Sequence, residues 1–495
     1  MLFNSLSFLV FFPVVTLIYF LLPHKYRWIH LLVSSYYFYM CWNAAYALLI
    51  AFSTLVTYAS GTAIDRANRM SVKERRERVK KLIVAASFLI NLGILVYFKY
   101  SNFILDNLTR AFAVLNIRLH VPQVDVLLPV GISFYTFQAL GYTMDVYRGT
   151  IRPIANPGKY ALFVSFYPQL VAGPIERSDN LIRQFDERHT FDLRRVSMGL
   201  LLMGYGLFQE MIVADRVAVA VNAVWADTAS YGSGAILLAT LLFSVQIYCD
   251  FAGYSNIAAG AAQVMGFKLM DNFRQPSFAR SIKEFWHRWH ISLSTWFRDY
   301  LYIPLGGSRK GKLRTQINLM ITFLVSGVWH GAAWTYIIWG GVHGIFQIIG
   351  GMTQPLRERL KGALGIRKDS WLDHAVRMLT TFALVNFTWI LFRANSVRGA
   401  LNICRRILAF NDMIPSMQML KHMGLDKMEW MVALISVIVL IAADWLQTKT
   451  CVREWIVSRP LLIRWAVYLI VIVSLIVWGV YGPGYDASQF IYFQF

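Results

Sequence analysis

The chain has 495 residues, of which 57% are hydrophobic and 15% charged, and its formal net charge is +21. The charged share lies well below the roughly 25% that is usual for soluble domains, which argues against a soluble globular protein. A mean hydropathy of +0.47 and long, continuous apolar runs favour a polytopic α-helical membrane protein. They argue against a β-barrel, whose strands alternate over about ten residues.

The excess positive charge gathers between the apolar runs, which is the pattern that fixes membrane orientation. Nucleic-acid binding is the rival interpretation of this charge, and interleaved apolar spans make it a poor one. We therefore expect membrane lipids, and no nucleic acid, around the chain. The four cysteines are scattered without a CxxC pair, so neither structural disulfides nor a thiolate metal site are expected.

The first third of the chain predicts several membrane passes, each needing about 20 apolar residues. Leu2–Leu22 is the first. Its nearest Lys and Arg residues come after the apolar run, whereas a cleavable signal peptide carries positive charge before it, so we expect a retained span. Trp28–Ile64 has room for two passes with a turn near Trp42–Asn43. The loop Asp65–Lys81 carries eight Lys or Arg against three acids, which predicts a cytoplasmic position.

The rest of the chain alternates apolar runs with polar connections. Two segments are predicted not to span: Tyr160–Pro174 is short and holds two prolines, and Phe273–Trp296 alternates aromatic and basic residues like an interfacial amphipathic segment. Counting the His330 region, we predict about eleven full or partial passes in a single integral membrane domain, residues 1–495. The remaining predicted spans are Leu82–Leu105, Val126–Val146, Leu379–Phe392, Trp430–Trp445 and Ile463–Tyr481, with one or two passes each in Val196–Trp225 and Ala235–Phe267.

The C-terminal tail, residues 482–495, ends in the sequence FIYFQF. Residues 465–495 contain no Lys or Arg. Because cytoplasmic loops of membrane proteins are enriched in these residues, we expect the tail to be extracytoplasmic. Composition alone favours an aromatic anchor at the membrane interface as the role of this ending.

His330 carries the sharpest chemical signal. No Asp, Glu, Lys or Arg lies between Arg314 and Arg357, so this histidine sits within 42 uncharged residues. An ionisable side chain at membrane depth is a functional-site hypothesis by default. Small neighbours on both sides let helices approach closely. A neutral imidazole is a natural general base for an alcohol near pH 7, and the alternative is a histidine that merely packs in a helix bundle.

His290 lies 40 positions earlier, where it shares one helical face with Ser294 and Phe297, and Arg298–Asp299 can form an ion pair. The alternative is an interfacial aromatic helix whose histidine is satisfied by a backbone carbonyl. A metal site is the other rival. Helical zinc motifs place their ligands at i, i+4 near a carboxylate, and His330 has no acid beside it, so we expect no metal.

The run Phe285–Gly344 resembles the membrane-bound O-acyltransferase (MBOAT) family. The likeness covers essentially the whole chain, and it is nearest to the alginate O-acetylation branch and more distant to the teichoic-acid D-alanylation branch. The chain departs from the family pattern at Gln209–Glu210 and at Asn256. The supporting stretches are PVGISFYTFQ (129–138), YPQLVAGPIER (167–177), DFAGYSN (250–256) and NFRQP (272–276).

The resemblance implies a ring of helices around a thinned, funnelled centre. Its cytoplasmic funnel would admit acetyl-CoA or another acyl thioester as donor substrate, with no permanently bound cofactor; the residues that bind the donor are not indicated. The family's essential histidine maps onto His330, and the histidine of its R-W-H motif maps onto His290. In the D-alanylation system a separate small protein ends in F-I-Y-F-x-F, and its acyl-accepting tyrosine maps onto Tyr492.

The implied function is O-acyl transfer in a bacterial plasma membrane. Acetyl from cytoplasmic acetyl-CoA would cross the membrane for O-acetylation of a surface or exported polysaccharide. An extracytoplasmic SGNH-type transferase is the expected partner, because no outside domain able to handle a glycan is found in the sequence. The alternatives are D-alanyl or other acyl transfer to teichoic acid or peptidoglycan, a non-catalytic scaffold, and a glycan transporter, although no internal repeat typical of transporters is found.

Overall fold

The computed structural model describes residues 1–117 and 122–481, which contain helices and no strand. The all-α class predicted from the sequence is therefore confirmed for the described residues. They form two compact units. The first is Met1–Leu200 with Ala258–Met270, and the second is Leu201–Ile257 with the described part of Asp271–Phe495. The extent of a single domain over residues 1–495 stays a prediction.

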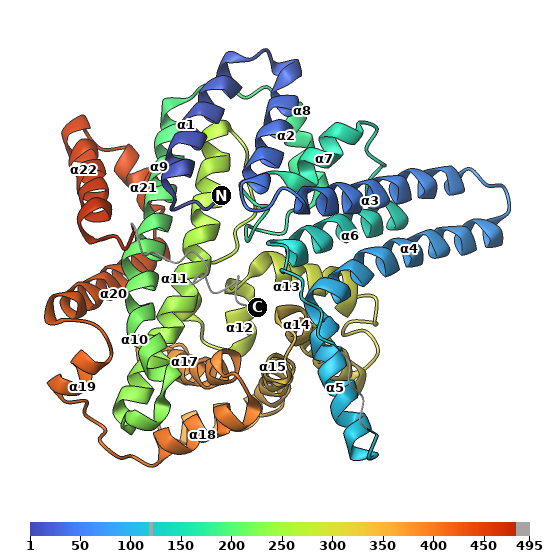
Figure 1. The fold of residues 1–495 in the computed structure, drawn as a ribbon. Coiled ribbons are helices and arrows are strands. Elements are labelled where there is room, and N and C mark those ends of the chain that lie inside the picture. Colours follow the sequence, from blue (N-terminus) through green and yellow to red (C-terminus); the bar gives the residue numbers. More distant parts are fainter. Residues whose placement is uncertain (118–121, 482–495) are drawn as a thin grey trace. The chain divides into compact units, whose positions relative to one another are not determined.

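The first unit is built from helices that the apolar runs predict. Figure 1 shows α3 and α4 as a long antiparallel pair whose connecting tip belongs to the basic segment Asp65–Lys81. The helices of this unit are α1 (Leu6–Leu21), α2 (His24–Met40), α3 (Tyr46–Asn68), α4 (Lys73–Leu95), the π-helical turn η1 (Val96–Tyr100), α5 (Ser101–Val114), α6 (Ile132–Arg148), α7 (Pro157–Ser165) and α8 (Ser178–Asp186).

The second unit holds both histidines of interest. Helices α9 (Leu193–Leu207) and α11 (Ser233–Met265) contribute residues to both units. The other helices of the second unit are η2 (Phe208–Ala214), α10 (Asp215–Ala226), η3 (Thr228–Ser230), η4 (Pro276–Phe278), α12 (Ile282–Arg288), α13 (Ile291–Phe297), η5 (Arg298–Tyr302), α14 (Lys312–His330), α15 (Trp334–Met352), α16 (Gln354–Ala363), α17 (Trp371–Arg393), α18 (Val397–Leu408), α19 (Met417–His422), α20 (Lys427–Gln447), α21 (Val452–Val457) and α22 (Leu461–Trp478).

Seven helical stretches of the described residues are long and apolar enough to cross a membrane. Helix α1 is also apolar but shorter, and α14 and α15 are not among the seven. The polytopic class is thus confirmed, while the count of about eleven full or partial passes stays a prediction. The seven stretches are Tyr46–Asn68, Lys73–Val114, Leu193–Ala226, Ser233–Met265, Trp371–Arg393, Lys427–Gln447 and Leu461–Trp478.

Several predicted boundaries can be compared with the structure. The turn predicted near Trp42–Asn43 is confirmed, because α2 ends at Met40 and α3 starts at Tyr46. The segment Tyr160–Pro174 is indeed too short to span as a helix: α7 ends at Ser165, and turns follow. Proline lacks a backbone N–H and disfavours helix in the residue before it, which explains the early end.

The two long runs in the middle of the chain were predicted to hold one or two passes each, and each is one continuous helical stretch. The first contains the π-helical turn η2, which carries the buried polar residues Gln209 and Glu210. A π-helical turn absorbs an extra residue without ending the helix. Beside it, a Cβ on Gly206 would lie 2.6 Å from the backbone oxygen of Gly253, so glycine allows α9 and α11 to touch.

Candidate active site

Helices α14 and α15 pack closely against each other because glycines line their contact. A Cβ on Gly340 would lie 2.2 Å from the backbone oxygen of Phe323, and one on Gly327 would lie 2.4 Å from that of Tyr336. Real Cβ atoms do not approach backbone oxygens so closely, so only glycine fits at these two positions. The prediction that small residues near His330 permit close helix approach is therefore confirmed.

His330 is the last residue of α14 and is 4% exposed. Its Nδ1 lies 2.7 Å from the backbone oxygen of Ser326. A carbonyl oxygen can only accept a hydrogen bond, so Nδ1 carries the proton and Nε2 keeps a lone pair. The ring lies among aromatic side chains, with centroid distances of 4.7 Å to Trp339 and 5.8 Å to Phe392. The lone pair on Nε2 lets the ring act as a general base.

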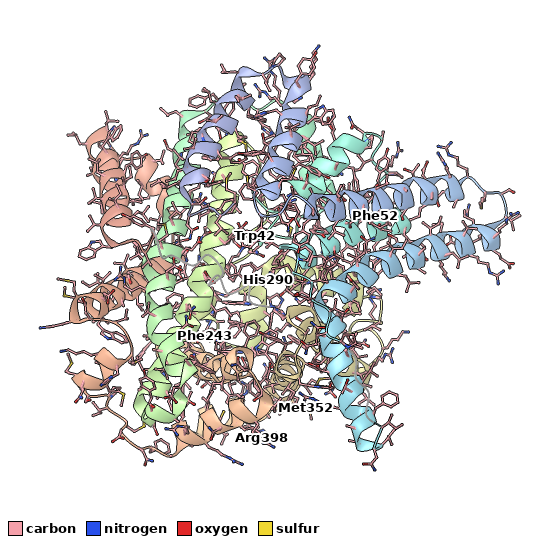
Figure 2. All side chains as sticks on the ribbon, viewed as in Figure 1. Trp42, Phe52, Phe243, His290, Met352 and Arg398 are labelled. Carbon is pink, nitrogen blue, oxygen red and sulfur yellow. The ribbon has the colours of Figure 1, made fainter. Side chains whose placement is uncertain are left out.

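His290 is fully buried and lies between two short helices, not within one. Figure 2 labels it near the position that α13 has in Figure 1. Helix α12 ends at Arg288, and His290 is the N-cap of α13 with left-handed backbone angles, φ 43° and ψ 54°. The sequence predicts one helical face for His290, Ser294 and Phe297. In the structure Ser294 and Phe297 lie within α13, and His290 lies at its N-cap. The predicted pair Arg298–Asp299 forms, with Nε and Oδ1 2.7 Å apart.

The environment of His290 keeps its ring neutral. Its Nδ1 lies 3.3 Å from Oδ1 of Asn272, and its ring packs edge-on against Phe251 with centroids 4.6 Å apart. Burial lowers the pKa of His290 well below its usual value, and protonation of nearby His330 would lower it further. His290 lies outside the seven candidate spans.

The structure brings the two sequence-predicted histidines into one aromatic cluster. The Trp329 ring contacts both, with centroid distances of 5.8 Å to His290 and 5.0 Å to His330. Two histidines that are 40 positions apart in the sequence thus lie in a single buried site. Two neutral imidazoles close together in apolar surroundings can accept and pass protons, which suits activation of a hydroxyl.

Comparison with known proteins decides the family. The family model described as MBOAT, membrane-bound O-acyltransferase family, matches residues 152–362. The probable alginate O-acetylase AlgI of Pseudomonas putida is 39% identical over 414 residues, covering 83% of this chain and 81% of the relative. The chain belongs to the membrane-bound O-acyltransferase family. It is therefore an acyl-transferring enzyme, and its candidate spans make it a multi-pass bacterial membrane protein.

Two further relatives show how the likeness is graded within the MBOAT family. The peptidoglycan O-acetyltransferase of Helicobacter pylori is 32% identical, covering 83% of this chain and 80% of the relative. The teichoic acid D-alanyltransferase of Bacillus subtilis is 26% identical and covers 55% of this chain and 70% of the relative. The likeness to relatives named for O-acetylation is thus higher and longer than the likeness to the D-alanyltransferase.

Both positions at which this MBOAT chain departs from the expected pattern meet in the second unit. Nδ2 of Asn256 donates to Oε1 of Gln209 at 2.7 Å. Both residues lie on candidate spans, where an unpaired polar side chain is costly. Asn256 thus supplies a hydrogen-bond donor to the buried carboxamide oxygen of Gln209, so the two departures are partners in the structure.

A third buried histidine, His343 on α15, was not selected from the sequence. The Trp286 indole N–H donates to its Nδ1 at 3.2 Å, and its Nε2 lies 3.0 Å from Oγ1 of Thr388. The Thr388 hydroxyl proton goes to the backbone oxygen of Val385, so Oγ1 accepts from His343. Both ring nitrogens are occupied, and His343 is thereby a packing residue that ties α12, α15 and α17 together.

The histidine and acid that precede His290 face elsewhere. His287 is exposed, and its Nδ1 bonds the backbone oxygen of Lys283 at 2.7 Å. The carboxylate of Glu284 pairs with Arg288 at 2.7 Å. Because α12 ends before His290, His287 and Glu284 do not share a helical face with His290. In the described part of the chain, no three His, Cys, Asp or Glu come together as a metal-ligand group.

The third predicted site residue, Tyr492, lies outside the described residues. The described chain ends just beyond α22, whose last turn is held in the second unit. Nη2 of Arg216 donates to the backbone oxygen of Trp478 at 2.6 Å, and the Val480 N–H donates to that of Met211 at 3.0 Å. The point at which the tail begins is thus tied to η2 and α10.

Proposed function

We propose that this MBOAT enzyme takes acetyl from cytoplasmic acetyl-CoA and delivers it across the membrane for O-acetylation of an exported or surface polysaccharide. The observation that carries the proposal is the buried His330, whose Nδ1–H is fixed by Ser326 so that Nε2 can accept a proton. The names of the relatives support acetyl as the group and a glycan as the acceptor, since they refer to alginate and peptidoglycan O-acetylation.

The chemistry is acyl transfer from a thioester to a hydroxyl. Nε2 of His330 takes the hydroxyl proton as the acceptor oxygen bonds to the thioester carbonyl carbon. The carbon–sulfur bond then breaks, and the departing CoA thiolate receives the proton from the imidazolium. The products are an acetyl ester and the CoA thiol, so the base is regenerated. Exclusion of water from such a buried ring protects the ester and the thioester from hydrolysis.

His290 serves to position the acceptor in this scheme. With its Nδ1–H directed at Asn272, the neutral ring offers Nε2 as a hydrogen-bond acceptor. An acceptor can hold a hydroxyl, whereas polarising the thioester carbonyl would require a donor. The hydrogen bond of Nδ1 to Asn272 therefore favours positioning of the acceptor hydroxyl over polarisation of the thioester carbonyl.

The first acceptor is the Tyr492 hydroxyl of the extracytoplasmic tail. A phenolate is a good leaving group, so an aryl acetate passes its acetyl readily to a second hydroxyl and divides one transfer into two. An extracytoplasmic SGNH-type transferase then carries acetyl to the polysaccharide. Support for this relay comes from the likeness of the tail to the ending of the acyl-accepting protein of the D-alanylation system.

Changing Tyr492 to Phe is expected to abolish acetylation of the polysaccharide while the protein still reaches the membrane. The substitution keeps the aromatic ring and removes only the oxygen that would carry acetyl. The measurement is O-acetyl content of the polysaccharide in cells, with Tyr481→Phe as control because the Tyr481 hydroxyl bonds the chain's own Ile476 oxygen. Normal acetylation in the Tyr492 variant would leave the tail as an aromatic anchor only.

The donor is tested by supplying two labelled thioesters to the purified enzyme in lipid vesicles. We expect label to pass from acetyl-CoA to the protein or to an added glycan acceptor. A D-alanyl thioester of the kind used for teichoic acids is expected to give at most background. Transfer from the D-alanyl donor alone would reverse the assignment and favour the D-alanylating branch.

A further inference from the structure

Asn272 lies in the connection between α11 and η4, and it is 3% exposed. It makes contacts with His290, with the two residues that follow His290 in the chain, and with Ser255 of α11. Its backbone oxygen accepts the Ile291 N–H at 2.9 Å. Its Oδ1 accepts the Ser292 hydroxyl at 2.7 Å and the Ser292 N–H at 3.4 Å, and its Nδ2 donates to Oγ of Ser255 at 3.1 Å.

These contacts fix which end of the Asn272 carboxamide faces His290. The Ser292 N–H can only donate, so the atom that it meets must be the carboxamide oxygen. The same oxygen lies 3.3 Å from Nδ1 of His290. Nδ1 must therefore carry the proton, and the lone pair of the neutral ring lies on Nε2. The tautomer of His290 thus follows from a backbone N–H two residues away.

Asn272 also lies where the backbone of the site is strained. His290 has φ 43°, a left-handed conformation that is unfavourable for a residue with a side chain. The two residues after it are held by Asn272, and Arg288, two residues before it, accepts the Arg274 N–H at 2.9 Å. The segment that starts at Asn272 therefore clamps the turn on both sides of His290. Strained backbone persists only where surrounding contacts over-determine it.

We propose that Asn272 is a positioning residue for acyl transfer: it fixes the Nδ1–H tautomer and the ring orientation of His290. This inference rests on the proposed function, in which His290 presents Nε2 to the acceptor hydroxyl. A neutral amide suits the task better than a carboxylate, because a carboxylate would stabilise the imidazolium and remove the lone pair. His330 is the titratable neighbour of His290, and a positive charge on either ring disfavours protonation of the other.

Two substitutions in the full-length enzyme test the inference. Asn272→Leu removes the acceptor, and we expect kcat to fall roughly 10- to 100-fold, the usual effect of losing an orienting partner, with little change in the donor KM. Asn272→Asp keeps an acceptor but adds charge, so the acidic limb of the pH–rate profile should move to higher pH. Histidine ¹⁵N NMR should report the Nδ1–H tautomer of His290 in the wild type and its loss in Asn272→Leu.

The matched control is Ser255→Ala, which removes the bond at the far end of the carboxamide and leaves Oδ1 in place. We expect this variant to keep the wild-type pH profile. A purely structural Asn272 would lower the yield of folded protein without moving that profile or the tautomer. Wild-type kcat, profile and tautomer in both Asn272 variants would overturn the inference, while loss of activity in His330→Ala would still uphold the proposed function.

Discussion

Replacing His330 by Ala is expected to lower acetyl transfer by about 10²- to 10⁴-fold, the range that a positioned general base contributes. The substitution removes the only group in the proposed scheme that takes the acceptor proton. The donor KM should change little, because the imidazole acts on the acceptor and not on the nucleotide part of the donor. The measurement is the rate of labelled acetyl transfer by purified enzyme in vesicles.

His287→Ala provides the matched control. This histidine lies in the same stretch of sequence, but it is exposed and bonded to its own helix. We expect wild-type activity from it. Retained activity in His330→Ala, with folded protein at normal yield, would mean that another group activates the acceptor.

Placing a methyl group on Gly340 is expected to be the most damaging small change in the site. The added Cβ would lie 2.2 Å from the backbone oxygen of Phe323 and 3.1 Å from two backbone atoms of Gly327. Backbone cannot move aside without separating α14 from α15, and overpacking of this kind costs about 1–3 kcal/mol or more. Trp339, whose ring lies 4.7 Å from His330, would shift with its helix, so kcat should fall as well.

Gly350→Ala on the same helix isolates the effect of the contact. Nothing lies within 4 Å of a Cβ built at Gly350, so this substitution adds a methyl group in open space. Alanine also favours helix over glycine by about 1 kcal/mol, which should make the control neutral or slightly stabilising. The measurement is the melting temperature of each variant, which we expect to be lower for Gly340→Ala than for Gly350→Ala. Equal melting temperatures would show that α14 and α15 do not need the glycine contact.

Much of this fold was predictable because apolar length and charge placement act locally. The uncharged run between Arg314 and Arg357 singled out His330, and the turn near Trp42–Asn43 followed from a run too long for one pass. Both signals lie within a few dozen consecutive residues. The continuity of the helical stretch Leu193–Ala226 was not predictable in the same way, because it depends on a π-helical turn that accommodates the buried polar residues Gln209 and Glu210 without ending the helix.

The geometry of the site was harder to predict, because its partners are distant in sequence. Helical spacing placed His290 on a continuous face, yet its left-handed backbone depends on contacts from Asn272, 18 positions away. His343 was not selected because its role depends on Thr388, 45 positions further on. The tautomers of His290 and His330 followed only once Nδ1 of each ring could be assigned an accepting oxygen. Sequence periodicity carries none of this information.

In the proposed mechanism, a thioester reaches Nε2 of the buried His330. The most direct measurement is an experimental structure of the full-length enzyme with a non-hydrolysable acetyl-CoA analogue. We predict that the acyl carbonyl carbon will face Nε2 of His330 across a gap that admits one hydroxyl group. The oxygen of that hydroxyl would lie about 3–3.5 Å from the carbonyl carbon, while its proton points at Nε2. A donor bound elsewhere, with His330 enclosed by Trp329, Trp339 and Phe392 and without a path to either side, would contradict the account.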